Sequence, residues 1–508
     1  MGEFGIYHKH IPTQGKFLRK GRSELLFEKE LSELRKVITS GSEDRRKQQL
    51  EAGKGTARER VEALLDAGSF VEMDALVSSQ QIGAGVITGW GTVEDRPVYV
   101  FAQDFTVKGG AMGQLQSKKI VKLLSMAVKT GAPVVALLDS AGVRVDEGAQ
   151  AMGAYSEVAH QLIRMSGVCP MLAVVCGPCM GSAATLAQLC DLCIVVEKET
   201  QMSVFGPQVM AAMNGLQVNA EQSGGAALAV KSGLSALCAA TEAEAIAKVR
   251  ALLDLLPSSN LEDADLLDTD DLNRKIAATE PAALAQEVAD AGSAMELFAG
   301  YEPAIRVFLA RVGGHSAMLI AACGKLTAGA LTKAARMVRF ADCYHLPVIS
   351  LLDTCGVTVD GIEAQAALIK AQAQLMYAFG EATAPKLCVV CGKAVGQAYV
   401  AMGGKGNADI AYAWPSAVIS ALTPEAAAAV LFADEIKADT ELTVEAAREK
   451  YAQRYVDETA DAVHAAACGM VDDIIAPETT RAMLIAALEM LSSKRDSGLP
   501  KKHGNLPL

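Results

Sequence analysis

PVVALLDSAGVRVD at residues 133–146 and PVISLLDTCGVTVD at residues 347–360 are two copies of one pattern, 214 positions apart. Further along the chain, LAVVCGPCMGSA (172–183) corresponds to LCVVCGKAVGQA (387–398) at a spacing of 215. The spacing is therefore nearly constant across the whole matched region, and helical stretches upstream also correspond. A self-similarity of this kind indicates a tandem duplication of one domain.

Each copy alternates short β-rich runs with alanine-rich segments of helical period, which predicts βαβ units and parallel sheets. Residues 255–274 are acidic and rich in Ser, Asn and Pro, as expected of a solvated connector. The sequence thus predicts a leader or loose arm (1–20), an N-terminal domain (21–255), an acidic linker region (256–294) and a C-terminal domain (295–508).

The composition excludes several classes of protein. A formal net charge of −12 argues against nucleic acid as the main partner. No apolar run approaches the ~20 residues of a membrane span, so we expect no direct membrane insertion. The chain has 12 cysteines and no secretory signal, which predicts reduced thiols in a cytoplasmic protein.

Two CxxC pairs, Cys176/Cys179 and Cys190/Cys193, have a spacing that four zinc ligands can adopt. The second copy tests this interpretation, because it keeps only the first of these cysteines, as Cys391. The other three positions are alanines in that copy. We therefore predict that the four cysteines are small buried hydrophobes and that this chain binds no metal.

What both copies keep is a strand, a turn and a helix that opens with small residues, Gly181-Ser182-Ala183 and Gly396-Gln397-Ala398. The first N–H groups of a helix lack intrahelical partners, and two of them can stabilise charge that develops on a carbonyl oxygen. Tight helix–sheet packing with Ser182 as an ordinary N-cap explains the same residues equally well. The residues alone leave both interpretations open.

Longer motifs resemble the carboxyltransferase subunits of biotin-dependent acyl-CoA carboxylases, such as the β subunit of propionyl-CoA carboxylase. These motifs are GKGTARERVEALLDAGSFVEMD (53–74), GVITGWGTVEDRPVYVFAQDFTVKGGAMG (85–113), LLDSAGVRVDEG (137–148), KLTAGALTKAARMVRFADCYHLPVISLLDT (325–354), GMVDDII (469–475) and KKHGNLPL (501–508). The resemblance covers nearly the whole chain from residue 21. The family also includes decarboxylase subunits of sodium-pumping complexes that act on glutaconyl-CoA or methylmalonyl-CoA.

The resemblance implies an α/β fold of two tandem crotonase-like (ClpP/crotonase) β/β/α spiral domains and a homohexamer. It implies transfer of a carboxyl group between carboxybiotin and the α-carbon of a short acyl-CoA, such as acetyl- or propionyl-CoA, through an enolate. No biotin attachment motif occurs, so biotin is expected on a separate biotin carboxyl carrier protein, with a biotin carboxylase subunit as a further partner.

Carried over by position, the family assigns one oxyanion hole to the acyl side and one to the biotin side. Gly181 and Ser182 would hold the thioester oxygen, and Gln397 and Ala398 would hold the ureido oxygen of biotin. The residues expected to bind substrate or cofactor are Gly110, Ala111, Gly142, Gly148, Gly356 and Gly396.

The chain departs from the family where Ser182 and Gln397 each replace a glycine, and where CGVTVDGIEAQ (355–365) replaces a PG-containing loop. Either replacement keeps the backbone N–H donor, but the added side chain narrows the path by which a carbonyl oxygen reaches it. Two alternatives follow for the function: a subunit that works in the decarboxylase direction, and a catalytically weakened structural subunit of a carboxylase complex.

Overall fold

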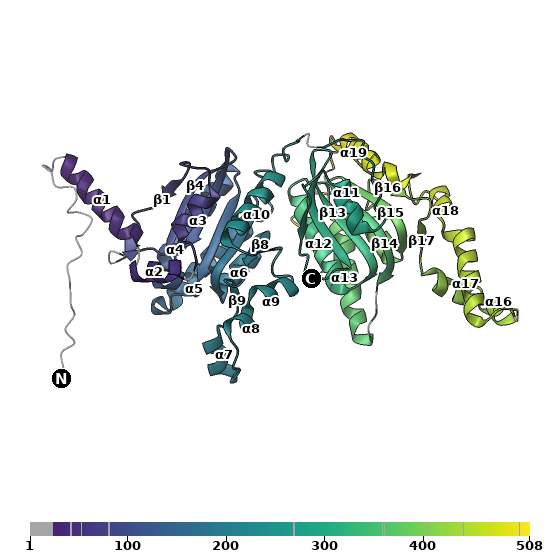
Figure 1. The fold of residues 1–508 in the computed structure, drawn as a ribbon, viewed down its shortest axis with the longest axis horizontal. Coiled ribbons are helices and arrows are strands. Elements are labelled where there is room, and N and C mark those ends of the chain that lie inside the picture. Colours follow the sequence, from purple (N-terminus) through teal and green to yellow (C-terminus); the bar gives the residue numbers. More distant parts are fainter. Residues whose placement is uncertain are drawn as a thin grey trace.

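The structure is a computed structural model that describes residues 24–40, 43–51, 53–79, 82–267, 270–357, 359, 361–404, 406–439, 441–496 and 498–507. The predicted leader at 1–20 lies outside these residues. Two α/β halves lie side by side, the first drawn in purple to teal and the second in green to yellow (Figure 1). Among the described residues, each half contains an eight-stranded sheet.

The two sheets have the same topology. In each, two antiparallel pairings at one edge are followed by parallel pairings, and a short strand is added beside the central one. The first sheet runs β1 (Val71–Met73), β4 (Val86–Val93), β5 (Arg96–Gln103), β6 (Val134–Ser140), β7 (Met171–Met180), β8 (Leu192–Val196) and β10 (Leu237–Ala239), with β9 (Gln201–Ser203) on β7. The second runs β11 (Met295–Leu297), β12 (Ile305–Val312), β13 (His315–Leu326), β14 (Val348–Val357), β15 (Lys386–Val395), β16 (Ile410–Ala413) and β18 (Asp473–Ile474), with β17 (Val418–Ser420) on β15.

Helices connect the parallel strands in the same order in both halves. Outside the sheets, β2 (Ser78–Ser79) pairs with β3 (Ile82–Gly83). The first half carries α1 (Glu24–Ser40), α2 (Glu43–Glu51), α3 (Ala57–Leu64), α4 (Gln114–Thr130), α5 (Ala149–Met165), α6 (Ser182–Leu189), α7 (Pro207–Asn214), α8 (Ala220–Gly224), α9 (Ala226–Lys231) and α10 (Glu242–Leu255). The second carries α11 (Pro281–Val288), α12 (Ala328–Cys343), α13 (Ile362–Glu381), α14 (Gln397–Met402), α15 (Pro424–Leu431), α16 (Ala433–Ala438), α17 (Val444–Tyr455), α18 (Ala462–Ala467) and α19 (Thr480–Leu491).

Helix α11 falls within residues 256–294, the region that the sequence assigned to a linker. Its apolar face, with Leu284 and Val288 fully buried, packs in the same core as Phe308 of the second sheet. Helix α3 occupies the matching place before the first sheet, and DAGS follows both helices in the sequence. The domain boundaries remain predictions, and the packing of α11 favours a second domain that begins near residue 280.

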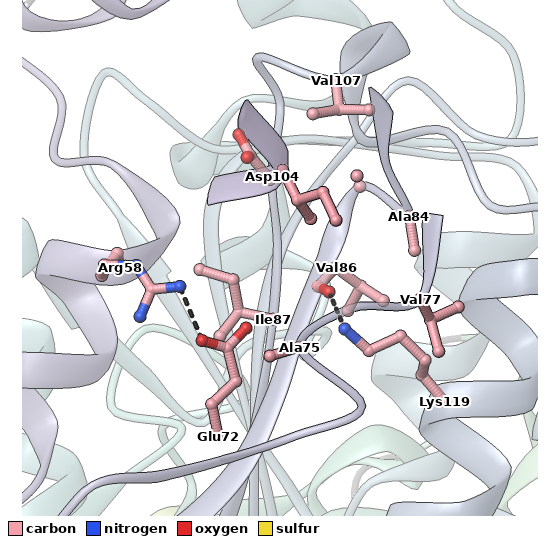
Figure 2. Close-up of a pocket in the computed structure, with 13 residues that line it drawn as sticks. Arg58, Glu72, Ala75, Val77, Ala84, Val86, Ile87, Asp104, Val107 and Lys119 are labelled. Atoms are coloured by element: carbon pink, nitrogen blue, oxygen red, sulfur yellow. Dashed lines mark hydrogen bonds and ion pairs between the residues drawn. The ribbon is translucent and has the colours of Figure 1, made fainter. Parts of the chain in front are cut away.

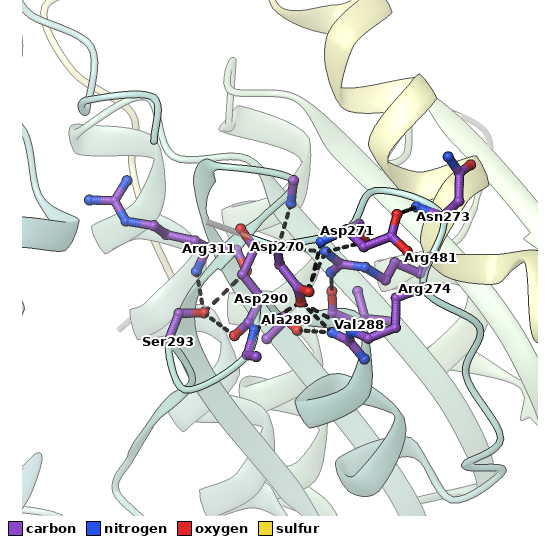
Figure 3. Close-up of polar contacts among 12 residues, drawn as sticks. Asp270, Asp271, Asn273, Arg274, Val288, Ala289, Asp290, Ser293, Arg311 and Arg481 are labelled. Atoms are coloured by element: carbon purple, nitrogen blue, oxygen red, sulfur yellow. Dashed lines mark hydrogen bonds and ion pairs between the residues drawn. The ribbon is translucent and has the colours of Figure 1, made fainter. Parts of the chain in front are cut away.

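Figure 3 shows the polar cluster around the second DAGS motif. Asp290 accepts hydrogen bonds from the backbone N–H groups of Gly313 and Gly314 at 2.8 Å, and it pairs with the fully buried Arg481 of α19 at 2.8 Å. In the first half, Asp66 pairs in the same way with Arg250 of α10 at 3.0 Å. Each aspartate thus ties the hairpin of its own sheet to the last helix of its half.

The halves are joined by apolar packing and by a small polar contact. One core contains buried side chains of both sheets. Tyr344, directly after α12, donates its hydroxyl to the carboxylate of Asp191 at 2.8 Å, and Arg336 of α12 donates to the backbone oxygen of the same residue at 3.1 Å. Burial raises the pKa of Asp191 to about 6, while the donors from Met171 and Tyr344 oppose that rise.

Candidate active site

Three segments meet where the central strands of the first sheet end: the loop after β5, the loop after β6 and the start of α6. The first two are bridged by backbone hydrogen bonds from Met112 to Gly142 at 2.8 Å and from Ala141 to Gly109 at 2.8 Å. A Cβ atom on Gly142 would lie 3.3 Å from the oxygen of Met180, so the second loop also touches the strand end before α6.

The structure therefore brings Gly110, Ala111 and Gly142 close to the start of α6. Gly148 lies farther along the second loop, where it precedes α5 with a φ of 55° and open space beside its α-carbon. These positions agree with a single binding surface, and their roles stay predictions.

The turn before α6 shows which N–H groups of the predicted oxyanion hole are already hydrogen-bonded. Gly181 has a φ of 58°, and its N–H donates to the oxygen of Ser203 at 2.8 Å, so this donor is already occupied. In the described structure, the N–H groups of Ser182 and Ala183 have no such acceptor. Ser182 and Ala183 are therefore the available pair, and Gly181 shapes the turn.

The second half repeats the conformation and the backbone hydrogen bond of this turn. Gly396 has a φ of 61° and donates to the oxygen of Ser420 at 2.8 Å, and among the described contacts Gln397 and Ala398 have free N–H groups. A Cβ atom on Gly356, which has a φ of 88°, would lie 3.3 Å from the oxygen of Val395. The predicted pair Gln397 and Ala398 thus matches Ser182 and Ala183 in position.

Sequence reasoning missed a buried ionic cluster beneath the first-half edge. Arg60 of α3 pairs with Asp139 at 2.9 Å and with Glu242 at 2.5 Å, and its side chain is 2% exposed. It also donates to the oxygen of Cys176 at 3.3 Å. These partners lie as far as 182 residues apart in the sequence, so no local pattern could have shown the contact.

A cavity of about 640 Å³ opens above this cluster. Asp139 and Pro178 form part of its wall, and the remaining lining includes three cationic side chains, Arg45, Lys54 and Lys108. An apolar ring, that of Phe105, also faces it. The cavity can therefore accept a ligand that combines negative charge with a flat ring.

The four cysteines of the CxxC pairs are buried in the first half. Cys176 and Cys193 lie in separate cores on opposite faces of the sheet, and each is 2% exposed. Burial raises the pKa of Cys193 to about 12, which disfavours the thiolate that a zinc ligand requires. Within the described part of the chain, no group of three or more His, Cys, Asp or Glu side chains is placed to hold a metal ion.

Comparison with known proteins identifies the family. A family model described as "Carboxyl transferase domain" matches residues 48–506. The chain belongs to this family. The methylmalonyl-CoA decarboxylase subunit alpha of Veillonella parvula is 38% identical, with 96% of this chain and 98% of that protein covered. The propionyl-CoA carboxylase carboxyltransferase subunit of Haloferax mediterranei is 37% identical, with 94% and 98% covered.

A solved structure supports the same assignment at the level of the fold. Transcarboxylase 12S, described as a hexamer with hydrolysed methylmalonyl-coenzyme A bound, superposes with a TM-score of 0.89 at 34% identity, covering 96% of this chain and 100% of that one. The predicted fold class and the predicted membership among biotin-dependent acyl-CoA carboxyltransferases are therefore confirmed. None of the helices in the described ranges is both long and apolar enough to cross a membrane.

Proposed function

We propose that this carboxyltransferase moves a carboxyl group between carboxybiotin on a separate carrier and the α-carbon of propionyl-CoA, which interconverts propionyl-CoA and methylmalonyl-CoA. The observation that carries this proposal is the duplicated strand–turn–helix in a chain whose relatives are named for these two acyl groups. Each copy offers one pair of N–H donors, and the reaction needs two carbonyl oxygens held at once, one on each reactant.

On the acyl side, we assign the thioester oxygen to the N–H groups of Ser182 and Ala183. Removal of the α-proton places negative charge on that oxygen, and two fixed N–H dipoles stabilise it by a few kcal/mol. The cavity beside Lys54 and Lys108 suits the phosphates and the adenine of coenzyme A. These residues bind and orient the ester and leave its α-carbon facing the second reactant.

On the biotin side, the residues fit a small cyclic urea. Gln397 and Ala398 supply two donors, and Gly356 and Gly396 keep the approach free of a β-carbon. When bound there, carboxylated biotin would supply the activated carboxyl group and a ring nitrogen able to take up the α-proton. The protein contributes the position of the ureido oxygen and, through the same N–H groups, stabilises charge on it.

The two holes belong to different halves, so both reactants must reach one space. The hexamer of transcarboxylase 12S supports a homohexameric assembly for this chain as well. We further propose a biotin carboxyl carrier protein and a biotin carboxylase subunit as partners, because this sequence has no biotin attachment motif.

A second candidate is the decarboxylase direction, which the relative from Veillonella parvula favours by its name and 38% identity. The same site would then release the carboxyl group instead of adding it. Purification of the native complex separates the two: an ATP-consuming biotin carboxylase in the complex supports carboxylation, whereas a membrane partner with sodium-stimulated decarboxylation supports the second candidate.

The direct test is the back reaction of the purified chain with biocytin and malonyl-CoA, methylmalonyl-CoA or glutaconyl-CoA. We expect release of propionyl-CoA that depends on biocytin, with methylmalonyl-CoA as the preferred ester. Absence of turnover with all three esters, from a folded hexamer, would refute the proposal.

A further inference from the structure

The loop that follows β5 has an unusual backbone. Three successive residues, Lys108, Gly109 and Gly110, have φ values of 51°, 66° and 62°. A left-handed conformation is costly for lysine, and any Cβ atom on Gly110 would clash with the backbone oxygen of Asp139. Strained segments of this kind persist only where surrounding groups hold them, and they concentrate at functional sites.

Two buried side chains hold this loop. Arg144 donates from Nε to the oxygen of Ala111 at 3.0 Å and from Nη2 to the oxygen of Ala84 at 2.8 Å. Gln116 donates from Nε2 to the oxygen of Gly85 at 2.9 Å and to that of Ala111 at 3.0 Å. Both side chains thus fasten the loop after β5 to the segment that leads into β4.

A third side chain donates to the backbone where this segment enters β4. Figure 2 shows Lys119 of α4 reaching the oxygen of Val86, a contact of 2.8 Å. The oxygens of three consecutive residues, Ala84, Gly85 and Val86, therefore each receive a side-chain donor. Charge-assisted and multidentate contacts of this kind fix a backbone more firmly than single neutral hydrogen bonds.

Arg144 and Gln116, which we call the clamp, are also linked to the start of α4. Glu147 accepts the N–H of Gln114 at 2.8 Å and lies 3.4 Å from Nη1 of Arg144. Arg144 and Glu147 are part of the loop after β6, which carries Gly142. One set of contacts therefore joins the loop after β5, the loop after β6 and the start of α4.

Fold stability alone does not account for this clamp. In the described structure, Oε1 of Gln116 is buried and has no hydrogen-bond partner, which costs free energy. The second half also folds without it: at a spacing of 214, Ala330 replaces Gln116 and Thr358 replaces Arg144 in the sequence. There the chain simply continues as strand β13 to Leu326.

We propose that Arg144, assisted by Gln116, is a positioning residue that fixes the 109–112 loop and thereby sets the affinity of the enzyme for acyl-CoA. The inference rests on the proposed function, since it takes this loop as part of the acyl-CoA site. It predicts an asymmetric effect, because in the sequence of the biotin side Ala330 and Thr358 stand at the positions of Gln116 and Arg144, and only Lys119 has a counterpart, Lys333.

The test compares R144M and R144K with R311M. Arg311 is a matched control: it is also buried, and it donates to the backbone oxygens of Gly314 in the β12–β13 hairpin, Asp265 in the connector and Asp254 near the end of α10. For each variant we would measure Tm, kcat, and KM for methylmalonyl-CoA and for biocytin. Amide hydrogen exchange of residues 109–113 gives a readout that needs no activity.

We expect R144M to raise KM for methylmalonyl-CoA by about tenfold or more, because small displacements of binding groups are costly. KM for biocytin should change less than about twofold, R144K should fall between wild type and R144M, and exchange of the loop amides should accelerate only in the Arg144 variants. The proposal is overturned if R144M behaves as R311M does, with a lower Tm but unchanged KM values and unchanged loop exchange. Wild-type protein without turnover would instead refute the proposed function, while the exchange comparison would still decide the role of the clamp.

Discussion

Replacing Arg60 by leucine removes the only cation that contacts Asp139 among the described residues. Asp139 is 1% exposed, its Oδ2 pairs with Arg60 at 2.9 Å, and its Oδ1 has no partner in the described structure. The substitution is sterically reasonable, because Leu284 stands at the matching position of α11 in the second half. The variant therefore mainly tests the charge.

The expected cost is large because the remaining carboxylate would be buried without compensation. Breaking a buried ion pair from one side costs about 3–5 kcal/mol. For a domain of this size, that corresponds to a Tm lower by about 10 °C. Burial already raises the pKa of Asp139, and Arg60 opposes that rise, so the pKa rises further in R60L.

The sign of the pH dependence follows from that rise. A carboxyl group whose folded pKa lies above its unfolded pKa contributes stability at low pH and loses it as the pH rises through the folded pKa. The loss of unfolding free energy in R60L relative to wild type should therefore be smaller near pH 5 than near pH 8.

The assay is thermal and urea unfolding at both pH values, with two companion variants. R58L removes the neighbouring arginine, whose pair with Glu72 is partly exposed, and should cost less than about 1 kcal/mol. R60L/D139N removes the more deeply buried of the two carboxylates that lose Arg60, while Glu242 stays unpaired with it, and should recover a large part of the loss. Equal losses in R60L and R58L, or no recovery in the double variant, would refute the reasoning.

Three further predictions concern the join between the halves, the biotin side and the cysteines. Y344F removes the hydrogen-bond donor to Asp191 and should lower the free energy of unfolding by about 1.5–3 kcal/mol at pH 8. The loss should be smaller at pH 5, because the pKa of Asp191, about 6 in the wild type, would rise further. Equal losses in urea unfolding at the two pH values would contradict this. Q397G should change kcat of the back reaction by less than about threefold if only the N–H acts, whereas a large gain would indicate an occluded biotin site and support the weakened-subunit alternative. Elemental analysis should find no stoichiometric zinc, and zinc that disappears in C190A would contradict our interpretation of the CxxC pairs.

The fold was largely predictable because the two copies share long motifs at a constant spacing. The earlier part of the repeat was not recognised, because helices α3 and α11 share mainly the short DAGS motif that follows them. Their equivalence becomes evident in three dimensions, where Asp66 and Asp290 each bind an arginine from the last helix of their half. Contacts between distant segments preserve a structural role after the sequence that supports it has diverged.

The segments of the candidate site could be proposed from the sequence, but the state of each N–H group could not. Small residues at a helix start indicate that N–H groups are accessible, but they do not show which of these groups the surrounding backbone already uses. Gly181 illustrates the limit, because its acceptor, Ser203, comes from the separate strand β9. Arg144 and Gln116 gave no signal either, since their partners are backbone oxygens, which carry no sequence information.

The two halves stabilise an equivalent aspartate carboxylate with different partners. Asp139 near the end of β6 lies so close to Gly177 of β7 that a side chain at that glycine would clash with it. Asp353 of β14 lies in the same way against Gly392 of β15. Asp353 accepts the backbone N–H of Lys393 at 2.8 Å. The matching residue in the first half is Pro178, which has no N–H to donate. Asp139 therefore depends on Arg60, and the first half gains a charged cluster under its cavity where the second half needs only a backbone donor.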